Sequence, residues 1–154
     1  VTANGYLLFV STIEPRKNLP VLLQALRIVR DRHPNRAYHL VAAGARGWRE
    51  TPILQQIDHL RLHDAITLLG SVGDDDLHWL YANSRIYANP SSGNAAMYLP
   101  PDDPVAWADA IELLWDNDDV RATLAARGPV HAARFSWQRA ARETLQLLTH
   151  VAVP

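Results

Sequence analysis

The chain has 154 residues, 48% of them hydrophobic, which is long enough for one compact domain and too short for two of ordinary size. Its 15 basic and 16 acidic residues give a formal net charge of −1, which argues against a nucleic-acid partner. The absence of cysteine excludes disulfides, thiolate zinc sites and a cysteine nucleophile, and it fits a reducing compartment. We predict one domain over residues 1–154, located in the cytoplasm.

Apolar runs alternate with helical patterns along the first 90 residues. Each run is typical of a short strand that is buried on both faces. The expected strands cover residues 6–10, 38–43, 65–69 and 85–88. The first expected helix is capped by Asn18, the second runs through 53–60 and the third begins at 74–76. In the third helix, Leu77, Leu80 and Tyr81 are expected to face inward. The alternation predicts a doubly wound, Rossmann-like α/β domain with a parallel sheet.

The last third of the chain is predicted to be helical after a possible short fifth strand at 95–99. The segment 100–104 supplies turn residues, an aspartate cap and a proline at the first helical position. Trp107, Ile111, Leu114 and Trp115 then recur at helical spacing. A further helix is expected from Val120 until the glycine and proline at 128–129, and a last one, capped by Ser136, through Leu148.

Ligands of an open parallel sheet lie beyond the carboxyl ends of its strands. The turn after the first strand places Arg16 and Lys17 immediately before a helix, whose free amide groups and dipole favour an anion. Such a cation pair is commonly solvated surface charge. At this position, both side chains can instead converge on a diphosphate, although the glycines of a dinucleotide fingerprint or a P-loop are absent.

From this turn onward the chain resembles the C-terminal domain of group-1 retaining glycosyltransferases of the GT-B fold. The resemblance begins with Phe9-Val-Ser-Thr-Ile-Glu-Pro-Arg-Lys-Asn18 and extends in the family's order to Phe135-Ser-Trp137. It implies that the domain binds a nucleotide-diphosphate hexose as donor substrate, with Arg16 and Lys17 on the diphosphate and Thr12 in the same turn. It also implies that Ser71 and Val72 meet the base, and that Gly44 lines the floor.

The sequence departs from the family between Ser91 and Ser92. There the family continues into a Glu-Gly-Phe-Gly loop, a second glutamate on the next helix and another strand, and this sequence has no counterpart. Either a segment is missing from the sequence as given or the protein lacks it. We therefore assign no catalytic glutamate, and we expect the isolated domain to bind its donor with hardly any turnover.

The resemblance also implies partners outside this chain. A separate N-terminal domain is expected to hold the acceptor, and any membrane association is expected to involve regions that the sequence does not contain. Val1 is not a start methionine, so we expect a piece of a longer protein. Two alternatives remain: a non-catalytic nucleotide-binding or interaction module, and a sugar-nucleotide epimerase or a phosphorylase. A phosphorylase needs a lysine for pyridoxal phosphate, and Lys17 is the only lysine.

Two further patterns are interpreted as structural. His59 and His63 stand one helical turn apart, but no third ligand accompanies them, so we expect no metal. We expect no organic cofactor either. Trp107, Trp115 and Trp137 lie on apolar stripes and are expected to pack. Trp48, beside Gly47 at a strand end, is the one tryptophan placed to meet a ligand, but a role as a core plug is favoured for it over ligand contact.

Overall fold

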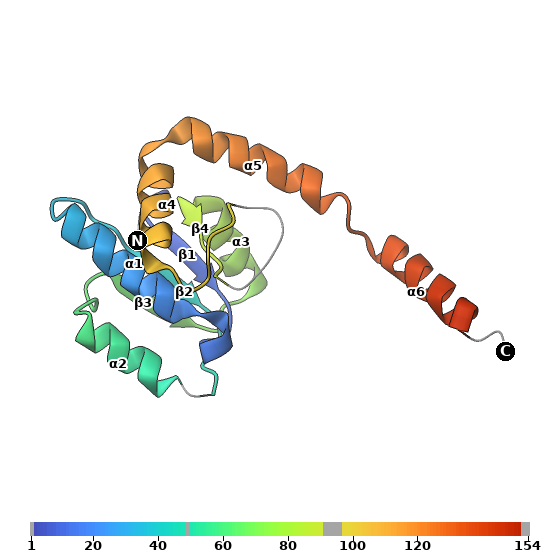
Figure 1. Cartoon of the computed structure of the whole chain (residues 1–154), viewed down its shortest axis with the longest axis horizontal. Helices are drawn as coiled ribbons and strands as arrows, with labels where there is room; N and C mark the ends of the chain where they lie inside the picture. The colour runs from blue at the N-terminus through green and yellow to red at the C-terminus, as the bar shows by residue number, and fades with distance from the viewer. Residues whose placement is uncertain (1, 49, 91–96, 152–154) are drawn as a thin grey trace.

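The computed structural model describes residues 2–48, 50–90 and 97–151 and contains one four-stranded parallel sheet (Figure 1). Its strands are β1 (Leu7–Val10), β2 (Leu40–Ala43), β3 (Ile66–Gly70) and β4 (Ile86–Tyr87), in the order β3-β2-β1-β4. The helices are α1 (Leu19–Arg32), α2 (Thr51–His59), α3 (Asp74–Asn83), α4 (Pro104–Asp116), α5 (Asp118–Ala132) and α6 (Trp137–Val151), with a short 3₁₀ helix, η1 (Pro15–Lys17), after β1. The four predicted strands are confirmed.

Successive residues of β1 belong to different cores on the two faces of the sheet. Leu7 and Phe9 join the larger core with residues of α1, α2 and α4, whereas Tyr6 and Leu8 pack with Leu80 of α3. Both faces of the sheet are therefore covered, which is why β1 is apolar at every position. This arrangement confirms the predicted Rossmann-like α/β fold.

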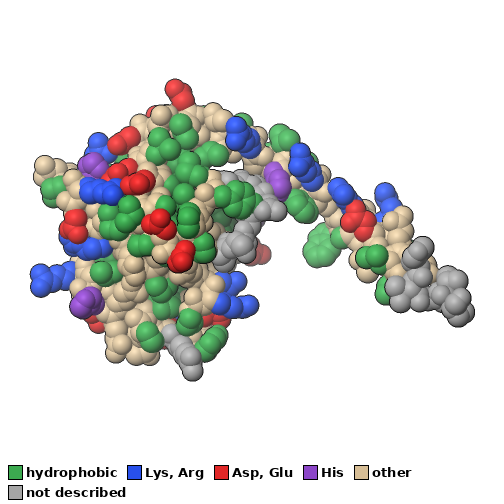
Figure 2. All heavy atoms as spheres, in the orientation of Figure 1, with side chains coloured by type: hydrophobic (Ala, Val, Ile, Leu, Met, Phe, Trp, Pro, Cys, Tyr) green, Lys and Arg blue, Asp and Glu red, His purple; other side chains and the backbone are tan. Residues whose placement is uncertain are grey.

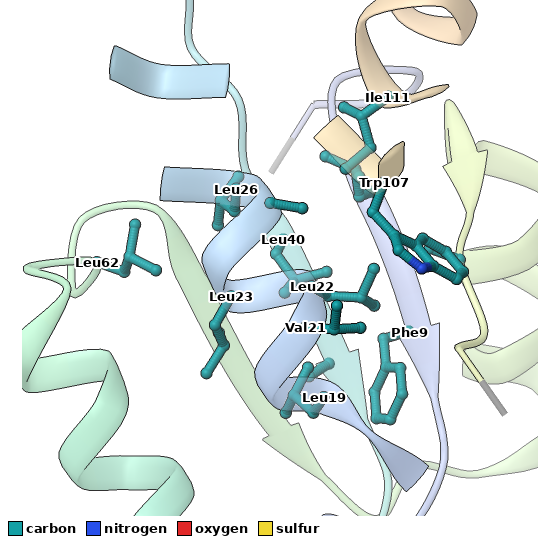
Figure 3. Close-up of a cluster of buried hydrophobic side chains, with 14 of the residues drawn as sticks. Phe9, Leu19, Val21, Leu22, Leu23, Leu26, Leu40, Leu62, Trp107 and Ile111 are labelled. Atoms are coloured by element: carbon teal, nitrogen blue, oxygen red, sulfur yellow. The ribbon is translucent and has the colours of Figure 1, made fainter. Parts of the chain in front are cut away.

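The larger core is built mainly between α1 and α4. Figure 3 shows Leu22 and Leu26 of α1 beside Trp107 and Ile111 of α4, and all four side chains are buried. At the start of α4, Asp103 Oδ1 accepts hydrogen bonds from the backbone amides of Val105 and Ala106, both at 3.0 Å. The predicted aspartate cap is thus confirmed.

Several local predictions about the helices were wrong. Tyr81 is 42% exposed and does not face inward. Helix α5 continues through Gly128 and Pro129, although a stop was expected there. Pro129 has no amide hydrogen to offer to the carbonyl of Ala125. Because Ala125 is exposed, water can hydrogen-bond to that carbonyl instead.

The remaining differences concern the tryptophans and the fifth strand. Trp137 begins α6 after the predicted Ser136 cap, yet it is 89% exposed and packs into no core. Trp48 is 57% exposed, so it is not a core plug. The predicted fifth strand, 95–99, lies partly outside the described residues, and the part that is described, 97–99, is not a strand.

Helices α5 and α6 lead away from the body of the domain as an extended arm (Figure 1). Among the described residues, no helix combines the length and the apolar character that crossing a membrane would require.

Candidate functional site

The turns that follow β1, β2 and β3 are joined by backbone hydrogen bonds at one edge of the sheet. The amide of Ser11 donates to the carbonyl of Ala43 at 3.0 Å, and the amide of Gly44 donates to that of Gly70 at 2.7 Å. This edge is where the carboxyl ends of parallel strands meet. The structure therefore gathers the predicted site residues Thr12, Gly44 and Ser71 at one edge.

Two glycines allow the turn after β2 to lie directly against the turn after β1. Gly44 has φ = +148°, and a Cβ atom there would stand 2.0 Å from the carbonyl oxygen of Ser11. A Cβ atom at Gly47 would stand 2.7 Å from Cγ2 of Thr12. Any side chain at either position would push the two turns apart, so these glycines set the shape of the edge.

The turn after β1 closes into η1 and carries both predicted phosphate ligands. The amide of Lys17 donates to the carbonyl of Glu14 at 3.1 Å, which tightens the turn. Arg16 is bonded through Nε to the carboxylate of Glu14, and 74% of its side chain is exposed against 7% for Glu14. The guanidinium is thus held on one side, and its other donors are open to a ligand.

Asn18 joins this turn to α4 through its side chain. It occupies the position before α1, as predicted, with φ = 57°, a left-handed conformation that asparagine tolerates well. The prediction that its side chain caps α1 was wrong, because Nδ2 donates to the carbonyl oxygen of Pro101 instead. The loop before α4 is therefore fastened to the turn that carries Arg16.

A hollow of about 610 Å³ opens where the turn after β1 faces the segment after β4. Arg16 and Asn18 line one side, Asn89 and Tyr98 contribute from later segments, and Trp107 of α4 also lines it. The strand order β3-β2-β1-β4 changes direction between β1 and β4, which makes this the topological switch point of the sheet. Doubly wound domains bind their ligands at such a point.

Two tyrosines lie next to Asn89, on the β4 side of the hollow. The rings of Tyr81 and Tyr87 meet edge to face with 5.1 Å between their centroids, and Nδ2 of Asn89 donates to the hydroxyl of Tyr87 at 3.3 Å. Asn89, which lines the hollow, thus contacts an exposed pair of tyrosines.

The predicted site residues lie at different distances from this hollow along the sheet. Arg16 lines it, whereas Thr12 and Gly44 belong to the contact between the turns after β1 and β2. Ser71 follows β3, two strands from β1, and Val72 packs against the smaller core. The expected break between Ser91 and Ser92 lies outside the described residues.

Reasoning from sequence did not single out Glu14, Asn18, Asn89, Tyr98 or Trp107 as part of this site. Asn89 and its neighbour Pro90 directly follow β4, so the rule for strand ends points to them. Glu14 and Asn18 lie in the same turn after β1 as Arg16, so the same rule points to them. Tyr98 and Trp107 carry no such signal, because only contacts between segments distant in sequence bring them to the site.

The histidines at 59 and 63 are placed differently from a metal pair. Nε2 of His63 lies 2.7 Å from Oδ1 of Asp58, and α2 ends at His59. Within the part of the chain that the structure describes, no three side chains of the metal-binding types come together.

A parallel sheet covered on both faces, with a hollow at its switch point, defines the chain as a Rossmann-like ligand-binding domain. The sequence matches the family model "Glycosyl transferases group 1" over residues 4–97, more than half of its length. The chain belongs to the group 1 glycosyl transferase family.

Relatives and solved structures agree with this assignment. The O-antigen chain mannosyltransferase B of Escherichia coli is 29% identical over 171 residues, covering 92% of this chain and 45% of the relative. A D-inositol 3-phosphate glycosyltransferase of Corynebacterium urealyticum is 25% identical, covering 90% of this chain and 41% of the relative. This chain thus spans less than half the length of these two relatives.

HepE of Anabaena, solved in complex with UDP and glucose, has a similar fold, with a TM-score of 0.75 at 16% identity. The match covers 96% of this chain and 49% of HepE.

Proposed function

We propose that this chain is the donor-binding domain of a glycosyltransferase that transfers a hexose from a nucleotide-diphosphate sugar with retention of configuration. One observation carries the proposal: Arg16 lines a hollow of about 610 Å³ at the switch point of the sheet. Membership of the family, the mannosyltransferase among the relatives and the UDP and glucose bound to HepE support it. The acceptor is held by an N-terminal domain outside this chain, and the protein works in the cytoplasm.

Arg16 and Lys17 bind the donor diphosphate in this proposal. An arginine fork and a lysine point charge both complement phosphate oxygens, and the start of α1 directly after them adds a favourable dipole. The same cations stabilise the negative charge that grows on the diphosphate as the sugar leaves. Thr12 and Gly44 shape the floor, and Ser71 and Val72 meet the base. Neither a metal nor an organic cofactor takes part.

Calorimetric titration with UDP, GDP and ADP tests the proposal. Arg16→Ala combined with Lys17→Ala is expected to weaken binding of the preferred nucleotide at least about tenfold, because charge-assisted hydrogen bonds are lost. Arg127→Ala combined with Arg142→Ala removes the same charge from exposed positions of α5 and α6 and should leave binding unchanged. Equal affinity of the first pair and the parent chain contradicts the diphosphate assignment. Titration with EDTA present checks that no metal is needed.

A second candidate is a non-catalytic nucleotide-binding module of the same fold. It is favoured by the absence of any glutamate between Glu50 and Glu112, the stretch that holds β4 and the segment after it. The two relatives align over 171 and 175 residues, more than the 154 of this chain, so each carries residues that the chain lacks. Nucleotide binding without sugar transfer by the full-length protein, with its acceptor-binding domain present, would favour this candidate.

A further inference from the structure

Glu14 is the one charged residue among those described that lies buried, with 6% of its surface exposed. Burying a carboxylate is costly unless a cation and hydrogen bonds compensate for the lost water. Here the compensating cation is Arg16, bonded through Nε. The pair therefore needs an explanation beyond surface charge, because one partner is buried and the other lines the hollow.

The backbone around Glu14 is held from two sides. Its carbonyl accepts the amide of Lys17 at 3.1 Å, and the amide of Gly47 donates to the carbonyl of the preceding Ile13 at 3.1 Å. A Cβ atom at Gly47 would stand 3.1 Å from Cβ of Glu14, so the turn after β2 lies directly over this residue. The backbone of Glu14 is thereby held in place, so its carboxylate can orient the exposed side chain of Arg16.

We propose that Glu14 is a positioning residue, which holds the guanidinium of Arg16 through Nε so that the two Nη groups address the donor diphosphate in the hollow. Arginine has five donors in a rigid fork, so one edge can bind a carboxylate while other donors bind phosphate. A long side chain that is already oriented loses less conformational entropy when its ligand arrives. This role rests on the proposed function, because it requires Arg16 to bind the diphosphate.

Whether removing the Glu14 carboxylate weakens or strengthens UDP binding separates a positioning role from simple electrostatic repulsion. A carboxylate near a diphosphate repels it, so a purely electrostatic Glu14 would weaken binding and its removal would strengthen it. A positioning Glu14 has the opposite effect, because its removal releases the Arg16 side chain, of which 74% is exposed. Two variants of similar size test this point: Glu14→Gln keeps an acceptor oxygen, and Glu14→Met fills the space without one.

The experiment is a double-mutant cycle in which the UDP affinity of the chain is measured by calorimetry. Glu14→Met is expected to weaken binding about tenfold, the equivalent of about 1.4 kcal/mol, and Glu14→Gln to stay within about threefold of the parent. In the Arg16→Ala background, Glu14→Met should have no further effect. In the Lys17→Ala background, which serves as the matched control, it should keep its full effect.

Three results would overturn the proposal. Tighter binding by Glu14→Met points to repulsion alone, and an equal loss in the Arg16→Ala background points to a general structural role. If Glu14→Met binds UDP as tightly as the parent while Arg16→Ala binds it more weakly, the positioning role is wrong and the proposed function stands. If Arg16→Ala itself binds UDP as tightly as the parent, both the positioning role and the proposed diphosphate binding are wrong. The thermal midpoint of each variant shows whether a loss of binding comes from unfolding.

Discussion

Gly44 stands where the backbone needs both a positive φ and the absence of a side chain. Its φ is +148°, and a Cβ atom would lie 2.0 Å from the carbonyl oxygen of Ser11. We expect Gly44→Ala to lower the free energy of unfolding by about 2–4 kcal/mol, because the turns after β1 and β2 must separate. Urea denaturation followed by circular dichroism measures the change.

Gly73 provides the matched control for this substitution. It has φ = −72°, and a Cβ atom there would meet nothing within 4 Å. Gly73 is the N-cap of α3, where alanine is poorer than glycine, so Gly73→Ala should lower the free energy of unfolding by less than about 1 kcal/mol, well below the loss at Gly44. Similar losses for both variants would show that the close approach at Gly44 is not what makes alanine costly.

The residues of the site were predictable to the extent that position along the chain determines them. The turn with Arg16 and Lys17 was found because it joins a strand to a helix start, and such a start attracts anions whatever else surrounds it. The buried state of Glu14 was not predictable in this way. It depends on the turn after β2 crossing over it near Gly47, a contact between segments more than 30 residues apart.

At the scale of elements, α4 depends on a cap that the sequence already indicates. Oδ1 of Asp103 accepts two backbone hydrogen bonds of 3.0 Å, and Pro104 occupies the first helical position. We expect Asp103→Ala to lower the free energy of unfolding by about 1 kcal/mol, because two amide groups at the helix start lose their acceptor. Thermal and urea denaturation both report this change.

The exposed neighbour Asp102 is the control for the cap. Its removal takes away the same charge near the same helix start, but the cap bonds belong to Asp103. Asp102→Ala should leave stability within about 0.5 kcal/mol of the parent. If the two alanine variants are equally destabilised, the charge near the helix dipole matters and the cap hydrogen bonds do not.

The caps at Asp103 and Ser136 were predicted correctly for a physical reason, whereas the cap expected at Asn18 was not found. A cap such as Asp103 or Ser136 acts through backbone groups two or three residues away, so the local sequence contains the whole interaction. Whether Tyr81 is buried depends on how much sheet lies beneath α3, and β4 has only two residues. The run of α5 through Pro129 likewise depends on solvent around an exposed helix.

At the scale of the whole molecule, α6 has an apolar face that no described residue of the body covers. Its side chains alternate between apolar and polar faces, and Trp137, Leu145 and Leu148 are 89%, 62% and 62% exposed. Figure 2 shows hydrophobic side chains along the arm, apart from the body. The helical period was visible in the sequence, but periodicity does not reveal what a face packs against.

Because α6 is separate from the core, its apolar residues should affect association of the chain and not its stability. We expect Leu145→Gln combined with Leu148→Gln to leave the free energy of unfolding within about 0.5 kcal/mol of the parent and to reduce self-association of the chain. Leu22→Gln combined with Leu26→Gln, at 1% exposure each in α1, should instead cost more than about 4 kcal/mol. Denaturation and sedimentation velocity measure the two properties, and a comparable loss of stability in both pairs would place α6 in the folded core.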